Sequence, residues 1–150
     1  MAVSYLGIAS DHAGFGYKEE IKKMLELESC NVRDYGIHEE NPVKDYKFVE
    51  DLCCGLNSGE IQRGIIICGT GIAVSIAANK IKGIRAALCN DIYTARKSRE
   101  HNDSNVLAFG ARVIGIDVAK EITKVWLSTG FEGGRHIPRN NYIAYLENKY

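Results

Sequence analysis

The segment Gly64–Cys68, which reads GIIIC, is the feature that most constrains the fold of this chain. It is short, continuously apolar and β-branched, so it lacks the alternation of a strand with one solvent-exposed face. A strand of this kind is typical of a parallel sheet that is covered on both faces. Because parallel strands are joined by long crossover connections, usually helices, we expect strands and helices to alternate along the chain.

Four further segments have the composition of strands. The predicted strands are Val3–Ser10, Cys30–Gly36, Gly64–Cys68, Ile84–Cys89 and Asn105–Gly110. Their starts recur about every 20 to 33 residues, close to the length of a βαβ unit. We therefore predict an α/β fold. It is a single domain over residues 1–150, with a doubly wound, Rossmann- or flavodoxin-like sheet of five parallel strands, helices on both faces and a C-terminal helix.

Apolar side chains at helical spacing indicate where helices lie between the strands. The stripes are Tyr17, Ile21, Met24 and Leu25, then Val49, Leu52, Cys53 and Leu56, and then Val118, Ile122, Val125 and Trp126. The Ala-rich segment Ile72–Lys80 predicts a short helix. Pro138 suits the first turn of a last helix, and Glu39–Lys44 reads as a loop.

Composition excludes several classes of function. The 19 basic and 19 acidic residues cancel, and the absence of a basic run argues against a nucleic-acid partner. The sequence has no apolar stretch of about 20 residues and no secretory leader, so we expect no membrane association. Its 5 scattered cysteines include no Cys-x-x-Cys pair, which favours reduced thiols in the cytoplasm and predicts neither a disulfide framework nor a metal site.

In a doubly wound sheet, ligands bind beyond the carboxyl ends of the strands. The residues that follow the predicted strands include Ser10-Asp11-His12, Cys68-Gly69-Thr70-Gly71, Asn90-Asp91 and Phe109-Gly110-Ala111-Arg112. At this position Cys68 has two interpretations. It is either a thiol made reactive by a helix N-terminus, or one more small apolar residue of the core. Asp11 likewise either contacts a ligand or caps the following helix.

The Gly69-Thr70-Gly71 loop does not match the common phosphate-binding motifs. No Gly-Lys-Ser/Thr follows it, and Val74 stands where a dinucleotide fingerprint needs glycine and a Cys-x5-Arg loop needs arginine. What remains is a glycine-rich turn that enters a helix, whose N–H groups suit an oxyanion or a phosphate.

Two further clusters carry chemical capacity. His101-Asn102-Asp103 comes just before the last strand, at the amino edge of the sheet, where it is either a solvated loop or part of a neighbouring subunit's site. Arg135, His136 and Arg139 lie near the start of the last helix, and arginine binds phosphate bidentately. His38 has no such neighbours and is expected at the surface.

With these residues in view, the chain resembles the type B ribose-5-phosphate isomerases, in the family that also holds galactose-6-phosphate isomerase subunits. The resemblance covers almost the full length. It rests on SDHAGF (Ser10–Phe15), CGTGIAVSIAANKIKGIRAA (Cys68–Ala87), SREHNDSNVLAFGARVIG (Ser98–Gly115) and FEGGRHIPR (Phe131–Arg139). It implies an aldose–ketose isomerase of the pentose phosphate pathway that needs no metal and no cofactor.

The resemblance also implies a role for each matching residue. Cys68 corresponds to the general base, and His101 corresponds to the residue that opens the furanose ring. Thr70 belongs to the loop whose N–H groups hold the enediolate oxygens in the family. The residues implied in substrate binding are Asp11, His12, Gly69, Gly71, Ile72, Ala73, Asn102, Arg112, Arg135, His136 and Arg139. The family forms dimers or tetramers with sites between subunits, which would explain the position of His101.

This sequence departs from the family pattern at two places. Ala73 replaces a glycine, which would cost strain if the position required a positive φ, and Lys47 replaces a proline after Asp45-Tyr46. Three alternative functions are left open. They are an isomerase for a six-carbon sugar phosphate such as allose or galactose 6-phosphate, a flavodoxin-like binder of FMN or another phosphate ligand, and a thiol redox protein.

Overall fold

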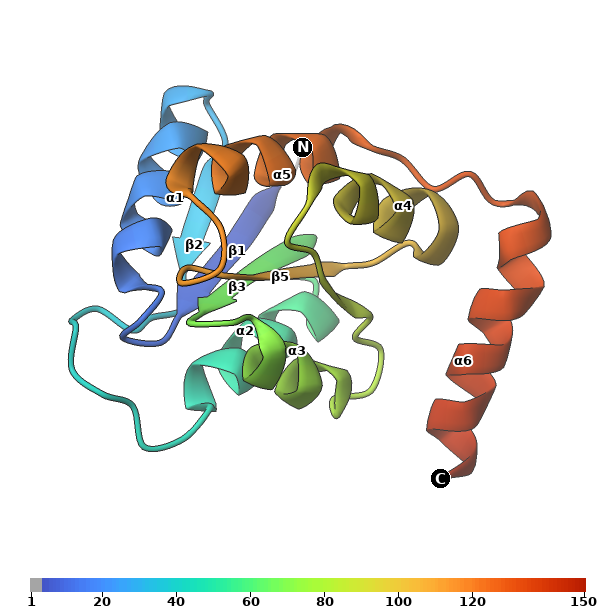
Figure 1. The fold of residues 1–150 in the computed structure, drawn as a ribbon. Helices are drawn as coiled ribbons and strands as arrows, with labels where there is room; N and C mark the ends of the chain where they lie inside the picture. The colour runs from blue at the N-terminus through green and yellow to red at the C-terminus, as the bar shows by residue number, and fades with distance from the viewer. Residues whose placement is uncertain (1–3) are drawn as a thin grey trace.

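The computed structural model describes residues 4–150, and its strands form one parallel sheet (Figure 1). In spatial order the strands are β2 Asn31–Asp34, β1 Tyr5–Ser10, β3 Arg63–Cys68, β5 Val106–Gly110 and β4 Ala86–Leu88. The chain moves outward from β1 to β2 and then returns across β1 to β3. The carboxyl ends of β1 and β3 therefore flank the topological switch point, where doubly wound sheets bind ligands.

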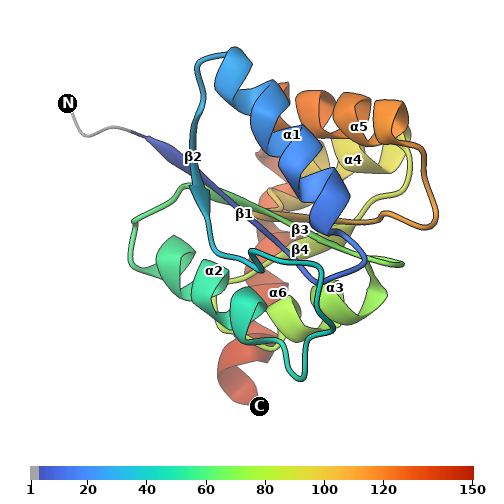
Figure 2. The same ribbon diagram turned by 90° about the vertical axis from the view of Figure 1, so that its left-hand side faces the viewer.

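Helices cover both faces of the sheet (Figures 1 and 2). The α-helices are α1 Phe15–Leu27, α2 Lys47–Asn57, α3 Ile72–Asn79, α4 Ile92–Asn102, α5 Ile116–Ser128 and α6 Ile137–Lys149, and a 3₁₀ turn, η1, spans Gly134–His136. Helices α1, α4 and α5 lie on one face, and α2 and α3 lie on the other. The prediction of a doubly wound α/β sheet is confirmed.

The pleat of β3 divides its side chains between two separate cores. Ile65 and Ile67 belong to the core beneath α1, α4 and α5. Ile66 and Cys68 belong to the core above α2 and α3. Because β3 is a central strand between β1 and β5, both sets are buried, as the continuous apolar run predicts.

The predicted strands are confirmed in place and chain order, and the two edge strands are the ones that end well short of the predicted bounds. The predicted Ile84–Cys89 strand is limited to Ala86–Leu88, which pairs with β5 alone because β4 is an edge strand. The predicted Cys30–Gly36 strand is the other edge, reduced to Asn31–Asp34. Val3, the predicted start of β1, lies outside the described residues.

Helix α4 was not predicted from the sequence. His101 and Asn102 are its last two residues, so the interpretation of them as part of a loop is wrong. The helix shows no apolar stripe in the sequence because the side chains that it buries are Ala95, Ser98 and Arg99. The start is nevertheless encoded locally. The Asp91 carboxylate accepts hydrogen bonds from the Thr94 N–H at 2.7 Å and the Thr94 hydroxyl at 2.9 Å, an ordinary N-cap.

Helix α6 lies at one side of the molecule (Figure 1), where the Gly83 N–H donates to Glu147 Oε1 at 2.9 Å. It begins at Ile137, one residue before the predicted Pro138, which occupies the first turn as expected. None of its residues is buried, although Tyr142, Ile143 and Leu146 are apolar. Within residues 4–150, no helix combines the length and the apolar character needed to span a membrane.

Candidate active site

Cys68 ends β3 with its side chain almost fully buried, at 5% exposure. Its Sγ accepts a hydrogen bond from the Gly71 N–H at 3.0 Å, at the entrance to α3. The sulfur therefore faces a backbone donor and the positive end of a helix, two features that stabilise negative charge. Cys68 combines the two interpretations of the sequence, because it is a core residue whose thiol faces an anion-stabilising turn.

Two other buried cysteines show the contrasting, purely structural case. Burial raises the pKa of the Cys53 thiol to about 12, with a further contribution from the nearby Cys54. Burial also raises the pKa of Cys89, against hydrogen bonds from Ser98 and Thr94. Both thiols are therefore protonated near neutral pH, and they serve as small apolar core residues.

The path of the turn after Cys68 requires one glycine in the turn itself and one in the neighbouring strand β5. Gly71 has φ +79°, and a Cβ there would lie 2.5 Å from Leu88 Cδ1 and 2.8 Å from the backbone carbon of Phe109. A Cβ on Gly110 of β5 would lie 2.7 Å from the backbone of Thr70. The loop thus packs directly on the end of β5, and this close approach fixes its path.

Thr70, Ile72 and Ala73 complete the loop and the first turn of α3. The Ile72 N–H donates to Thr70 Oγ1 at 3.2 Å. The Thr70 hydroxyl is exposed, and its O–H remains available to donate a hydrogen bond to a ligand. Ala73 lies inside α3, and the residues other than glycine that have positive φ among those described are Ser29 and Asp103. Alanine at position 73 therefore carries no backbone strain.

Asp11 and His12 follow β1 and lie next to this loop, because Ser10 pairs with Ile67 in the sheet. Asp11 Oδ1 accepts a hydrogen bond from the Gly14 N–H at 3.0 Å, so Asp11 caps the turn that leads into α1. His12 Nδ1 is buried and has no hydrogen-bond partner among residues 4–150. An unpartnered buried nitrogen beside the Cys68 loop is available to a bound ligand.

Arg112, which follows β5, lies over the same loop. Its backbone N–H donates to the Gly69 oxygen at 2.9 Å. Its Cδ is 3.4 Å from the point that a Cβ on Gly69 would occupy, so glycine makes room for this side chain. The exposed guanidinium therefore provides positive charge at the carboxyl edge of the sheet. We call Asp11, His12, Cys68–Ala73 and Arg112 the Cys68 cluster.

A second set of predicted residues lies where α4 ends and α6 begins. The rings of His101 and His136 are stacked, with centroids 4.2 Å apart and planes 16° apart. Asn140 Nδ2 donates to the His101 backbone oxygen at 3.1 Å, which ties α6 to α4. His136 is buried, whereas Asn102, Arg135 and Arg139 are exposed. We call His101, Asn102, Arg135, His136 and Arg139 the His101 cluster.

Arg99 holds the end of α4 in place. Its Nη1 donates to Asp103 Oδ1 at 2.8 Å and to the Ser104 oxygen at 2.6 Å, and its Nε donates to the Thr129 oxygen at 3.2 Å. Asp103 ends the helix with φ +47°. This buried arginine joins the segments on either side of His101, so the position of the His101 ring depends on it.

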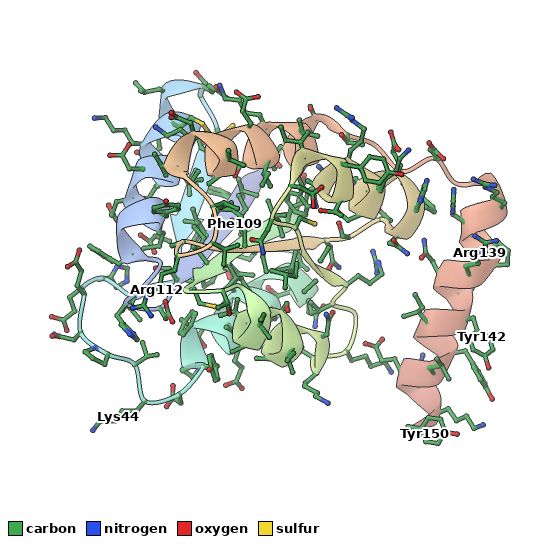
Figure 3. The ribbon with its side chains drawn as sticks, viewed as in Figure 1. Lys44, Phe109, Arg112, Arg139, Tyr142 and Tyr150 are labelled. Atoms are coloured by element: carbon green, nitrogen blue, oxygen red, sulfur yellow. The ribbon has the colours of Figure 1, made fainter. Side chains whose placement is uncertain are left out.

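The two clusters lie apart within one chain. Figure 3 shows Arg112 beside the loops at the carboxyl edge of the sheet and Arg139 on the distant α6. The expected placement of residues 101–103 at the amino edge is confirmed, because α4 ends just before β5 begins. The structure therefore brings together the residues within each cluster, but it does not bring the two clusters together.

Sequence reasoning missed one residue at the His101 cluster. Glu132 Oε2 is 3.3 Å from His136 Nε2, and the Glu132 N–H donates to the Glu100 oxygen at 3.0 Å. A spacing of four residues signals such a contact only within a helix, whereas Glu132 lies in the irregular segment before η1 and Gly133 has φ +69°, so the sequence carries no signal for it.

Lys47, the other departure from the family pattern, begins α2 without disturbing it. The Lys47 N–H, which a proline would lack, donates to Asp45 Oδ1 at 3.0 Å. Tyr46 is 45% exposed and packs its ring against Phe48 at a centroid distance of 6.1 Å.

Comparison with known proteins identifies close relatives of the whole chain. Residues 6–143 match the family model described as Ribose/Galactose Isomerase. The chain is 42% identical to ribose-5-phosphate isomerase B of Escherichia coli over 96% of its own length and 97% of that protein's. It is also 42% identical to D-erythrulose-4-phosphate isomerase of Pectobacterium atrosepticum, over 96% of its own length and 95% of that protein's.

Solved structures agree with these matches. The Clostridium thermocellum ribose-5-phosphate isomerase B structure is 49% identical and superimposes with a TM-score of 0.95, covering 97% of this chain and 99% of the other. The structure of ribose-5-phosphate isomerase B from Mycoplasma genitalium with bound ribulose 5-phosphate is 35% identical, with a TM-score of 0.92 and full coverage of both chains at 100%.

Proposed function

This chain belongs to the ribose/galactose isomerase family, and on that premise we propose that it interconverts ribose 5-phosphate and ribulose 5-phosphate. The observation that carries the proposal is the Cys68 thiol at a strand end, hydrogen-bonded by the Gly71 N–H. The reaction moves a proton between C1 and C2 and exchanges the oxidation levels of these two carbons. It therefore consumes no external oxidant or reductant.

Cys68 is the general base in this proposal. As the thiolate it removes the proton from C2 of the open-chain aldose and returns it to C1 of the enediolate. A base held in position contributes about 10²–10⁴-fold to the rate. The Gly71 N–H and the first turn of α3 stabilise the thiolate while it waits for substrate.

The loop that follows Cys68 stabilises the enediolate. The first N–H groups of an α-helix have no partner within the helix. In this turn the Gly71 N–H donates to Cys68 Sγ and the Ile72 N–H donates to Thr70 Oγ1, and in this proposal the substrate oxygens take over these donors. Fixed donors of this kind act on the charge that develops in the transition state. The Thr70 hydroxyl supplies a further donor at the same place.

Binding energy for the phosphate comes from positive side chains away from the reacting carbons. Arg112 lies in the Cys68 cluster, and Arg135, Arg139 and His136 lie in the His101 cluster. Gripping a remote phosphate orients C1 and C2 against the base, which favours the reaction without touching the reacting bonds. Asp11, His12 and Asn102 bind the sugar hydroxyls.

A complete site needs two copies of the chain. His101 opens the furanose ring, so it has to reach the same substrate as Cys68, yet the two clusters are separate in one chain. In a homodimer or homotetramer the His101 cluster of one copy would serve the Cys68 cluster of another. The exposed apolar side chains of α3 and α6, among them Ile72, Ile76 and Ile143, supply a surface for this association.

Mixing two inactive variants tests the shared site. Cys68→Ala and His101→Ala homodimers are each impaired. A mixed dimer contains one site with both intact residues, so random mixing should restore about a quarter of wild-type activity. Recovery after mixed refolding supports a site between subunits, whereas a mixture no more active than its parents places both residues in one chain. Light scattering on the wild type then distinguishes dimer from tetramer.

Substrate choice is tested by one coupled assay over sugar phosphates of different length. We expect the highest kcat/KM on ribose 5-phosphate. The six-carbon alternative is not favoured, because the relatives with the same fold are named for ribose 5-phosphate. The similarity to a D-erythrulose-4-phosphate isomerase makes the four-carbon sugar phosphate the more informative comparison. A higher kcat/KM on it would overturn the choice of ribose.

We propose that the enzyme works in the cytoplasm, in the pentose phosphate pathway. The 5 cysteines are free thiols in the structure, and Cys54 is exposed. Such thiols persist in a reducing compartment. A binder of FMN could use the same loop and arginines, but it would need neither Cys68 nor His101. A thiol redox protein would need a second cysteine at Cys-x-x-Cys spacing, which this sequence lacks.

A further inference from the structure

Three potential metal ligands converge at the His101 cluster. One nitrogen each of His101 and His136 and a carboxylate oxygen of Glu132 all lie within 4.8 Å of one another. We propose that these three side chains bind one divalent cation of the zinc type, and that this cation inhibits the enzyme by withdrawing His101 from the reaction. The ligands come from the end of α4 and from the segment before α6, and Glu132 follows His101 by 31 positions.

The spacing of the donors fits a small tetrahedral ion. Zinc lies about 2.0–2.2 Å from nitrogen and oxygen ligands, so two ligands of one tetrahedral ion are roughly 3.3–3.5 Å apart. His136 Nε2 and Glu132 Oε2 are already 3.3 Å apart. His101 has a donor within 4.8 Å of both, and it completes the set when its ring turns out of the stack with His136, in which the two planes are 16° apart. Three protein ligands leave a fourth position for water.

The buried nitrogen of His136 is a second, independent indication. The side chain is 5% exposed, and Nε2 makes no hydrogen bond within residues 4–150 even though Glu132 is close. Buried polar atoms are normally satisfied, so an unpartnered nitrogen that faces a carboxylate and a second imidazole points to a ligand. Glu132 is 50% exposed and gives an ion a path from solvent.

The ligand types select among cations. Two imidazoles and one carboxylate favour Zn²⁺ or a similar transition metal over Mg²⁺ and Ca²⁺, which prefer oxygen ligands. The surrounding charge is mixed, since Glu100 opposes the nearby cations Lys97, Arg135 and Arg139. Lys97 is paired with Glu100 at 2.7 Å, and both arginines are exposed. Affinity therefore depends on the Glu132 carboxylate as the charged ligand.

Inhibition follows from the chemistry of His101 and rests on the proposed function. A histidine nitrogen that holds a cation can neither accept nor donate the proton that opens the furanose ring. The cation also consumes His136, one of the proposed phosphate ligands. Binding itself does not depend on catalysis, so it can be measured whether or not the protein is an isomerase.

The test uses the full-length protein freed of metal by chelation, its Glu132→Gln variant and a Glu100→Gln control. Calorimetric titration with Zn²⁺ should give one site per chain in the wild type and in the control. Loss of a supporting residue outside the ligand set costs about 10–100-fold in metal affinity, so Glu132→Gln should weaken binding by at least about 10-fold. Without metal, Glu132→Gln should keep its isomerase activity.

Titration with Co²⁺ distinguishes this site from the thiols. Nitrogen and oxygen ligands give ligand-field bands without the intense charge-transfer band of thiolate coordination. Zn²⁺ should inhibit the wild type, and a chelator should restore activity. The proposal is overturned if Glu132→Gln binds Zn²⁺ as tightly as the wild type does, or if the Co²⁺ spectrum shows thiolate ligands. If the protein binds one Zn²⁺ through Glu132 but isomerises no sugar phosphate, the metal-site proposal stands and the proposed function is refuted.

Discussion

The Cys68 cluster and the His101 cluster are built in different ways. The first is held by backbone, since the Gly71 N–H bonds to Cys68 Sγ and a close approach of Gly110 to Thr70 fixes the loop on β5. The second is held by side chains, through the stacking of His101 on His136 and the contacts of Arg99. Groups fixed by buried backbone suit a reacting centre, whereas a side-chain cluster at the junction of α4 and α6 suits contact with another copy.

The largest expected effect is the loss of the base. Cys68→Ala should lower kcat for ribose 5-phosphate by about 10⁴-fold, the upper end for a proton-transfer group, because it removes the group that carries the proton. The variant should fold normally, since alanine leaves a small gap at the end of a strand. Circular dichroism and thermal unfolding check the fold beside the coupled assay. Near-normal activity in a folded Cys68→Ala protein would refute the assigned role.

A buried ion pair between Lys18 and Asp34 supports the strand end that precedes Asp11 of the Cys68 cluster. Lys18 is fully buried, and its Nζ donates to both oxygens of Asp34 at 2.8 Å and to the Ile37 oxygen at 2.6 Å. Residues 36 and 37 in turn exchange hydrogen bonds of 2.8 Å with Ser10, directly before Asp11. Asp34→Asn should therefore cost about 3 kcal/mol in the free energy of unfolding, because it leaves the buried Lys18 charge with only the half-exposed Glu19 carboxylate, at 3.5 Å, as counter-ion.

The Lys18–Asp34 pair makes the free energy of unfolding depend on pH. Burial acts to raise the pKa of Asp34, but hydrogen bonds from Lys18, Lys22 and the Gly36 N–H outweigh it and lower the pKa below 3.8. The stabilisation is thus complete above about pH 4 and is lost as the pH falls through the folded-state pKa. Urea unfolding from pH 6 to pH 2 should show this loss in the wild type. A fall of the same size in Asp34→Asn would assign it to other carboxylates.

Asp103, which ends α4 next to the His101 cluster, is the aspartate to compare with Asp34. Its carboxylate is 42% exposed and pairs with Arg99, and its backbone has φ +47°. Asparagine tolerates this left-handed conformation and keeps an oxygen for Arg99. Asp103→Asn should therefore cost about 1.5 kcal/mol in unfolding free energy, less than Asp34→Asn, because the buried Arg99 guanidinium keeps the Ser104 and Thr129 oxygens as acceptors. A cost equal to that of Asp34→Asn would remove the contrast between the two clusters.

Two glycines sharpen the contrast further. Gly71→Ala should destabilise the protein by about 3 kcal/mol, because the left-handed backbone disfavours a Cβ and the Phe109 backbone stands in its way. Gly134 of η1 also has a positive φ, +56°, but a Cβ there meets nothing within 4 Å. Gly134→Ala should cost only about 1 kcal/mol. Denaturant titration of both variants measures the difference in unfolding free energy. Equal costs would show that the Cys68 loop moves to make room for a Cβ at position 71.

The sequence predicted the Cys68 cluster better than the His101 cluster for a physical reason. The GIIIC strand, the glycine turn and the helix entry are consecutive, so residue spacing and local preferences define their arrangement. Helix α4 was missed because it buries Arg99 and Ser98 in place of an apolar stripe. The contact of Glu132 and His136 with His101 joins segments about thirty residues apart, which composition and periodicity do not reveal. Family resemblance supplied His101 and His136, but not Glu132.

The smallest expected effect on catalysis concerns the furanose ring. Ring opening also occurs slowly without the enzyme, so His101→Ala should lower kcat/KM for ribose 5-phosphate by about 10²-fold, the low end for a proton-transfer group. D-erythrose 4-phosphate provides the control. Its only hydroxyl that could close a five-membered ring carries the phosphate, so it enters the site already open. His101→Ala should lose far less on this substrate, whereas Cys68→Ala should lose activity on both. Equal losses for His101→Ala would mean that His101 acts on the enediolate step, and that the two clusters share one task instead of dividing ring opening from isomerisation.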